Sequence, residues 1–103
     1  MGVVIALFSV VPMGKESLSE DVAGVIDLID RSGIEYRLTA MGTIVEGDPE
    51  EVWSVIRRCH ETMRASSKRV ITTISIDDRE GKSDAIRSKV DRIEKRLSRK
   101  LKT

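Results

Sequence analysis

The segment from residue 34 to residue 47 constrains the fold more than any other stretch of this chain. Apolar and polar residues alternate over residues 34–40 and again over residues 43–47, and Gly42 lies between the two runs. Such alternation is typical of strands with one buried face, and a glycine lets the chain turn. We therefore predict a β-hairpin that turns near Met41 and Gly42, with its second strand as one wall of the functional site.

Two further strands are predicted, one before the hairpin and one after it. Residues 3–11 form an almost unbroken apolar and β-branched run that ends before Pro12, as in a central strand buried on both faces. Residues 68–78 alternate again. Because side chains alternate across a strand, one face of the first strand is predicted to supply the core with Val4, Ala6, Phe8 and Val10.

Three amphipathic helices are predicted from apolar residues spaced three and four apart. The first follows a capping box formed by Ser17 and Glu20 and ends at Gly33. The second begins after Asp48, whose side chain is suited to an N-cap. The third spans about residues 83–101, and its basic residues alternate with acidic ones, which favours a solvated face.

The element order predicts a single α+β domain over residues 1–103 with a ferredoxin-like fold and an additional C-terminal helix. Strand, helix, strand, strand, helix, strand is the split βαβ motif, which gives a four-stranded antiparallel sheet with both helices on one face. The other face is partly apolar, so we expect the last helix, a second subunit or both to cover it. Its predicted members are Ile5, Leu7, Ser9, Ile71, Thr73, Ser75 and Asp77.

Composition limits the classes of partner. The net charge of +1 argues against a nucleic-acid binder, and the open face lacks the aromatic side chains that stack on RNA bases. The one cysteine excludes an internal disulfide, and no apolar segment is long enough to span a bilayer. We therefore expect a cytoplasmic protein with no membrane contact. One cysteine and one histidine are too few for a zinc site.

Two local clusters contain chemically active side chains. Cys59 and His60 are adjacent on a helix, so they point about 100° apart and do not form a nucleophile–base pair. We expect Cys59 in the core and His60 at a helix rim. Asp77, Asp78 and Arg79 are either the rim of a site or a solvated turn with a local ion pair. An enzyme that uses them is the weaker hypothesis, because no nucleophile or histidine lies near them in the sequence.

Four segments, in chain order, resemble the thiamine-binding protein family of small single-domain proteins. They are residues 10–14, 32–36, 41–47 and 76–79, and Met-Gly-Thr-x-x-Glu-Gly at residues 41–47 is the most specific of them. The resemblance covers nearly the whole chain. It implies a ferredoxin-like fold, a homotetramer, and binding of thiamine or its hydroxymethylpyrimidine precursor with no catalytic residue and no cofactor.

The resemblance also implies a small-molecule site beside the hairpin. A partly desolvated carboxylate, either Glu46 or Asp77, would hold the cationic thiazolium or the aminopyrimidine. Hydroxyl and backbone groups would add neutral hydrogen bonds, and the Met41 thioether would pack against a ring. The expected ligand-binding residues are Ser9, Met41, Gly42, Thr43, Glu46 and Asp77.

The sequence leaves open which face of residues 43–47 lines the site. We prefer Glu46 at a rim or interface, because burying it unpaired would cost several kcal/mol. Alternatively, Glu46 forms an interface ion pair with Arg37 or Arg79. These two arginines and Asp78 are the expected residues of the site rim or interface.

The leading hypothesis is a non-catalytic protein that binds thiamine or a related pyrimidine at the open sheet face or at a subunit seam of a homotetramer. The alternative is an interaction module, whose open face and last helix serve only assembly or a protein partner. The sequence does not decide whether the last helix packs on its own subunit or on another.

Overall fold

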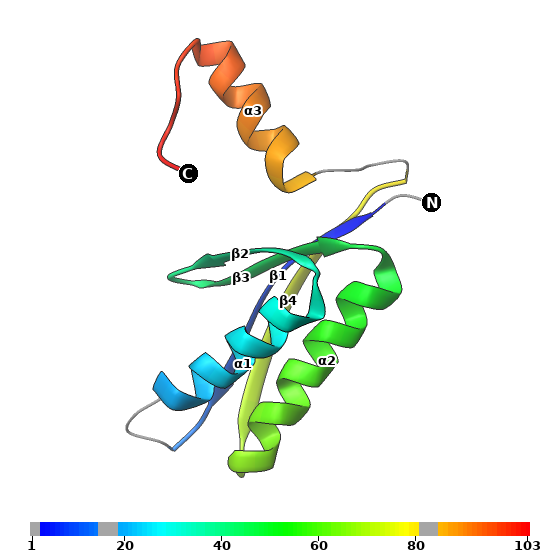
Figure 1. Cartoon of the computed structure of the whole chain (residues 1–103), viewed down its shortest axis with the longest axis vertical. Coiled ribbons are helices and arrows are strands. Elements are labelled where there is room, and N and C mark those ends of the chain that lie inside the picture. Colours follow the sequence, from blue (N-terminus) through cyan, green and yellow to red (C-terminus); the bar gives the residue numbers. More distant parts are fainter. Residues whose placement is uncertain (1–2, 15–18, 81–84) are drawn as a thin grey trace.

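The computed structural model describes residues 3–14, 19–80 and 85–103. The elements follow in the order β1 (Val4–Pro12), α1 (Ser19–Ser32), β2 (Glu35–Thr39), β3 (Gly42–Gly47), α2 (Pro49–Ser66), β4 (Val70–Asp78) and α3 (Ala85–Leu97). This order confirms the predicted ferredoxin-like fold with an added C-terminal helix (Figure 1). The predicted capping box at Ser17 and the start of the last helix at residue 83 lie outside the described residues.

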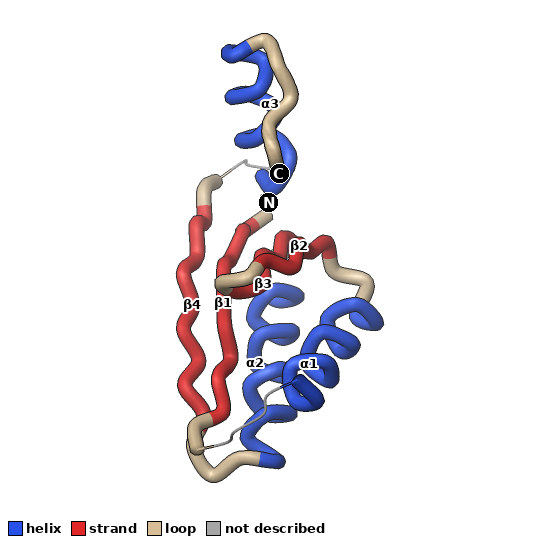
Figure 2. The backbone as a smooth tube through the Cα atoms, turned by 90° about the vertical axis from the view of Figure 1, so that its left-hand side faces the viewer, coloured by secondary structure: helices blue, strands red, loops and turns tan. Residues whose placement is uncertain are grey.

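The sheet is antiparallel, with the strand order β2-β3-β1-β4. Ala6 of β1 lies opposite Val45 of β3 and Ile76 of β4. Directly opposed side chains share a face, so these three define the face that packs against α1 and α2. Figure 2 shows both helices on this one side of the strands. β1 is therefore a central strand: it pairs with β3 on one side and β4 on the other, and one of its faces packs against the helices.

The core lies between the sheet and these two helices. Its largest fully buried side chains are Ile29, Val45, Val52, Cys59 and Met63. Phe8 is 3% exposed, and the predicted core positions of Phe8 and Cys59 are confirmed. His60 lies at the helix rim, where its Nδ1 atom is 2.6 Å from the Thr72 hydroxyl oxygen of β4.

Local signals explain where the first two helices begin or end. The Asp48 carboxylate accepts a hydrogen bond from the Glu50 amide over 2.9 Å, and Pro49 occupies the first helical position of α2. After α1, Gly33 has a φ of +79°, a backbone conformation that favours glycine at a helix C-terminus. Both features agree with the sequence prediction.

The last helix is shorter than predicted. It ends at Leu97, because Ser98 adopts a φ of +57°. The amides of Ser98 and Arg99 donate to the carbonyls of Lys95 and Glu94, which completes a C-terminal cap. Residues 98–101 therefore do not continue the helix, although their apolar spacing suggested that they would.

The α3 helix stands away from the body of the protein (Figure 1, Figure 2). Its N-terminal half contacts the end of the sheet, whereas Ile93 and Leu97 farther along are 54% and 48% exposed. On the open face, Leu7 and Ile71 also remain exposed. Within one subunit, α3 therefore does not provide the expected cover for this face. No helix among the described residues has the length and apolar character needed to cross a membrane.

Candidate functional site

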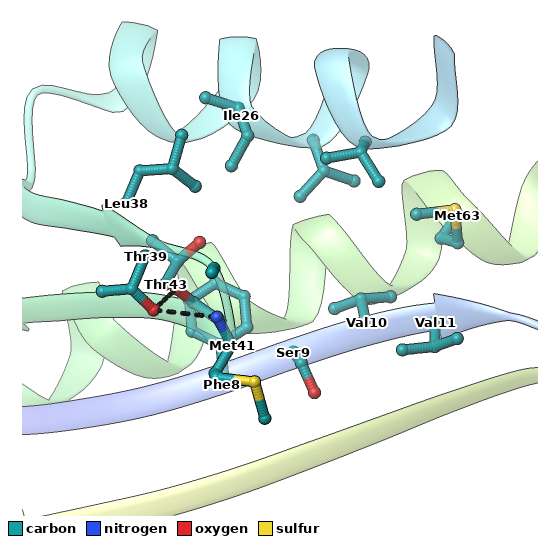
Figure 3. Close-up of a pocket in the computed structure, with 14 residues that line it drawn as sticks. Phe8, Ser9, Val10, Val11, Ile26, Leu38, Thr39, Met41, Thr43 and Met63 are labelled. Atoms are coloured by element: carbon teal, nitrogen blue, oxygen red, sulfur yellow. Dashed lines mark hydrogen bonds between the residues drawn. The ribbon is translucent and has the colours of Figure 1, made fainter. Parts of the chain in front are cut away.

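The tip of the β2–β3 hairpin is fixed by its own hydrogen bonds and by one glycine. The Thr39 hydroxyl donates to the Gly42 carbonyl over 2.7 Å and accepts from the Met41 amide over 3.2 Å (Figure 3). Gly42 has a φ of +154°, and a Cβ atom there would lie 2.8 Å from the Phe8 carbonyl oxygen. Only glycine allows the hairpin to approach β1 this closely.

A cavity of about 240 Å³ lies between this tip, β1 and α1 (Figure 3). The hairpin side includes Leu38 and Thr43, which are paired across the two strands and face the helices. The wall opposite them comes from α1, and its residues are Val22, Val25 and Ile26. The lining is thus largely apolar, with hydroxyl and backbone groups at the hairpin end.

The strand register resolves the orientation that the sequence left open. Thr43 is paired with Phe8 and is 6% exposed, so Thr43 and Val45 face the helices. Glu46 is paired with Ile5 and therefore points toward the open face. The cavity lies on the helix side of the sheet, whereas we expected the ligand at the open sheet face or at a subunit seam.

The expected ligand-binding residues fall into two groups that the structure does not bring together. The group that borders the cavity consists of Ser9, Met41, Gly42 and Thr43. Ser9 borders it with its main chain, because its hydroxyl lies on the side of β1 away from α1 (Figure 3). Glu46 and Asp77 both pair with Ile5, near the opposite end of β1, and point to the open face.

Glu46 and Asp77 hold the α3 helix. Glu46 is 7% exposed, and its carboxylate accepts a hydrogen bond from the Ile86 amide over 3.0 Å. The first amides of a helix have no partners within the helix, and a negative charge is favourable beside them. Asp77 forms an ion pair with Lys89, with 3.0 Å between Oδ2 and Nζ. Both carboxylates therefore bind groups of α3 in their own subunit.

The predicted rim residues Arg37, Asp78 and Arg79 do not converge on one point. Asp78 is on the opposite side of β4 from Asp77, because neighbouring residues of a strand alternate. Arg79 follows the strand and is exposed. Among the residues that the structure describes, neither arginine forms an ion pair with Glu46 within the subunit, and the expected ion pair across an interface stays a prediction.

Cys59 is enclosed in the core and is 0% exposed. Burial raises the pKa of its thiol to about 11, because the charged thiolate is disfavoured away from water, and the nearby Arg58 charge opposes this only in part. Such a thiol is a poor nucleophile at neutral pH. Within the described ranges, no three His, Cys, Asp or Glu side chains are grouped closely enough to hold a metal ion.

Sequence reasoning missed the wall that α1 gives to the cavity. Val22 and Ile26 belong to the apolar residues, spaced three and four apart, that predict the first helix. Val22 is 41% exposed and Leu38, across the cavity, is 59% exposed. Apolar spacing gives the direction of a side chain but not the gap that it faces, so the sequence offered no signal that separates these residues from the core.

A family model described as thiamine-binding protein matches residues 6–94. The chain belongs to this family. Among curated relatives of this thiamine-binding family protein, a UPF0045 protein of Mycobacterium bovis is 39% identical over 98 residues, covering 93% of this chain and 96% of that protein. A UPF0045 protein of Methanothermobacter thermautotrophicus is 32% identical, with 89% and 97% covered.

Solved structures agree with the fold of this thiamine-binding family protein. A hypothetical protein from Methanocaldococcus jannaschii matches with a TM-score of 0.78 at 30% identity, covering 95% of this chain and 98% of that one. A Thermotoga maritima protein described as a candidate thiamine biosynthesis/salvage protein matches with a TM-score of 0.77 at 25% identity, with 88% and 98% covered.

Proposed function

We propose that the protein binds thiamine or a related aminopyrimidine, such as hydroxymethylpyrimidine, without transforming it. The binding site is the cavity between α1 and the tip of the β2–β3 hairpin. The observation that carries the proposal is that residues 41–43, the start of the most specific family segment, border this cavity. The family's description as thiamine-binding supports the class of ligand.

The size and lining of the cavity suit one flat ring. Its volume of about 240 Å³ is below the roughly 300–1,000 Å³ of pockets that enclose drug-sized ligands. Aliphatic side chains from α1 and Leu38 would contact the faces of the ring. The described residues that line the cavity include no carboxylate. The pyrimidine is therefore the ring expected inside, and the cationic thiazolium stays toward water, where its charge remains hydrated.

Calorimetric titration with thiamine and with hydroxymethylpyrimidine tests this proposal. Both are expected to bind, and no heat at millimolar ligand would contradict it. To locate the site, Val22→Trp places an indole at the partly exposed mouth of the cavity and is expected to abolish binding. Ala23→Trp is the matched control, because Ala23 is exposed on the same helix and does not line the cavity. Unchanged binding in Val22→Trp would place the site elsewhere.

A second candidate function is assembly, and the uncovered apolar side chains favour it. Leu7, Val11 and Ile71 on the open face are 42%, 39% and 43% exposed, and α3 adds Ile93 and Leu97. Burying side chains of this kind is worth about 1.5–3 kcal/mol each. We infer that other copies of the chain cover them in a homotetramer. Light scattering is expected to give about four subunits, and a monodisperse monomer would contradict this inference.

A further inference from the structure

The sheet narrows beside the cavity, and this leaves one edge of β1 without a neighbouring strand. The pairing of β1 with β3 ends at Phe8 and Thr43, whereas the pairing of β1 with β4 continues to Pro12 and Val70. Among the described residues, no strand lies along the β3 side of β1 beyond Phe8. The cavity occupies this position, and Ser9, Val10 and Val11 border it.

The direction of the main-chain groups along this edge follows from two contacts. The Met13 amide donates to the Arg69 carbonyl over 2.8 Å, so Met13 points toward the β4 side. The Phe8 carbonyl oxygen lies beside Gly42 and so points toward β3. In an antiparallel sheet, successive residues direct their amide and carbonyl to alternate neighbours. Val11 therefore bonds toward β4, and Val10 directs both its amide and its carbonyl to the β3 side.

We propose that the Val10 amide and carbonyl are the hydrogen-bonding groups with which the cavity recognises its ligand. They would select a flat heteroaromatic ring that carries an amino group beside a ring nitrogen. This inference rests on the proposed function and specifies which part of the ligand is recognised. The amino group would donate to the Val10 carbonyl, and the ring nitrogen would accept from the Val10 amide. The ligand then completes the hydrogen bonds that an additional strand would make.

The chemistry of the surroundings supports this assignment. A ligand in the cavity would remove the Val10 amide and carbonyl from water, so both groups would then require partners, and the apolar walls formed by Val22 and Ile26 supply none. Pro12, the next residue that directs its main chain to this side, has no amide hydrogen. Val10 therefore offers the one adjacent donor and acceptor at this point of the described edge. A pyrimidine whose amino group is replaced by oxygen presents the wrong pattern to this pair.

Ligand analogues test the inference in the intact protein. Oxythiamine has an oxygen in place of the pyrimidine amino group, and pyrithiamine keeps the aminopyrimidine but has a pyridinium in place of the thiazolium. Mismatch at a carbonyl that the bound ligand removes from water costs about 1–3 kcal/mol, and 1.4 kcal/mol is tenfold in affinity. We expect oxythiamine to bind roughly 10-fold to 100-fold more weakly than thiamine, and pyrithiamine to bind within about threefold of it.

Valine-selective ¹⁵N labelling gives a direct second measurement. On saturation with thiamine, the Val10 amide resonance is expected to shift and its hydrogen exchange to slow. The Val52 amide is the internal control, because Val52 lies on α2, does not line the cavity, and already donates to the Asp48 carbonyl. If thiamine binds, but oxythiamine binds equally well and the Val10 amide is unchanged, the inference is wrong and the proposed function stands. If none of the three compounds binds, both are wrong.

Discussion

Glu46 shows how a single side chain can be suited to a ligand and yet serve the fold. Its carboxylate lies under the N-terminus of α3 and accepts a hydrogen bond from the Ile86 amide. Glu35 lies directly opposite on β2, points to the same face, and is exposed. The two glutamates therefore differ mainly in the helix that one of them holds, and they form a matched pair for mutation.

Glu46→Ala is expected to loosen α3 without affecting the cavity. Loss of a side chain that caps a helix costs about 0.5–2 kcal/mol. Hydrogen exchange should become faster over the first turns of α3, whereas the affinity for thiamine should stay within about twofold, because Glu46 is on the other face of the sheet. Glu35→Ala should change neither quantity. A strong loss of thiamine affinity in Glu46→Ala but not in Glu35→Ala would contradict this prediction and indicate that Glu46 takes part in ligand binding.

Cys59 gives a prediction based on ionisation. With its pKa raised to about 11, only about one thiol in a thousand is ionised at pH 8, and the side chain is also enclosed. Iodoacetamide should therefore leave the folded protein unmodified at pH 8 and label it rapidly in denaturant, as measured by mass spectrometry. Rapid labelling of the folded protein would contradict the core position.

At the scale of elements, the hairpin and α1 each contain a glycine, and the two glycines differ in the space available for an added side chain. At Gly42, an added methyl group would meet the Phe8 carbonyl oxygen at 2.8 Å and the Leu7 side chain at 3.2 Å. At Gly24 on α1, an added Cβ atom would have no atom within 4 Å apart from its chain neighbours and the backbone of the helix itself, and the residue is exposed. The same substitution should therefore have opposite effects in the two elements.

Gly42→Ala is expected to destabilise the protein by about 1–3 kcal/mol, because overpacking forces the hairpin away from β1. Gly24→Ala is expected to stabilise it by about 0.5–1 kcal/mol through the better helix propensity of alanine. Urea unfolding measures both free energies. A neutral effect of Gly42→Ala would mean that the hairpin tip does not depend on its close approach to β1.

The elements themselves could be predicted because their signals are local. Alternation gave the four strands and the face of Phe8, and Asp48 gave the start of α2. The end of α3 could not be predicted, since the residue with a positive φ at this end is Ser98 and not a glycine, which would have marked the end of the helix in the sequence. The cavity was also missed, because it depends on where β3 stops relative to β1. How far two paired strands run side by side depends on the tertiary structure, and the alternation of apolar residues within each strand does not predict it.

At the scale of the molecule, the two candidate functions use opposite sides of the sheet. The cavity lies under α1, whereas the exposed aliphatic residues Leu7 and Ile71 lie on the face that the helices leave open. Leu38 is also exposed, but it is on the helix side. Assembly and ligand binding are therefore expected to respond to different substitutions.

Leu7→Asp is expected to reduce the proposed homotetramer to a smaller species, because it places a charge on the apolar surface that other copies are proposed to cover. Leu38→Asp is the matched control and should leave the mass unchanged, since it removes an exposed leucine from the other side. Multi-angle light scattering reads out both. If both variants keep the mass of the unaltered protein, the open face is not the surface through which copies associate.

The central position of β1 has a consequence for how such proteins can diverge. Phe8 and Val10 are on the side of this strand that faces the proposed ligand cavity, and Leu7 and Ser9 are on the side proposed for assembly, so successive codons would serve separate purposes. A descendant could exchange its small molecule by altering alternate positions while keeping its quaternary structure. Sequence similarity within this family should then predict the fold and the oligomeric state better than it predicts the identity of the bound metabolite.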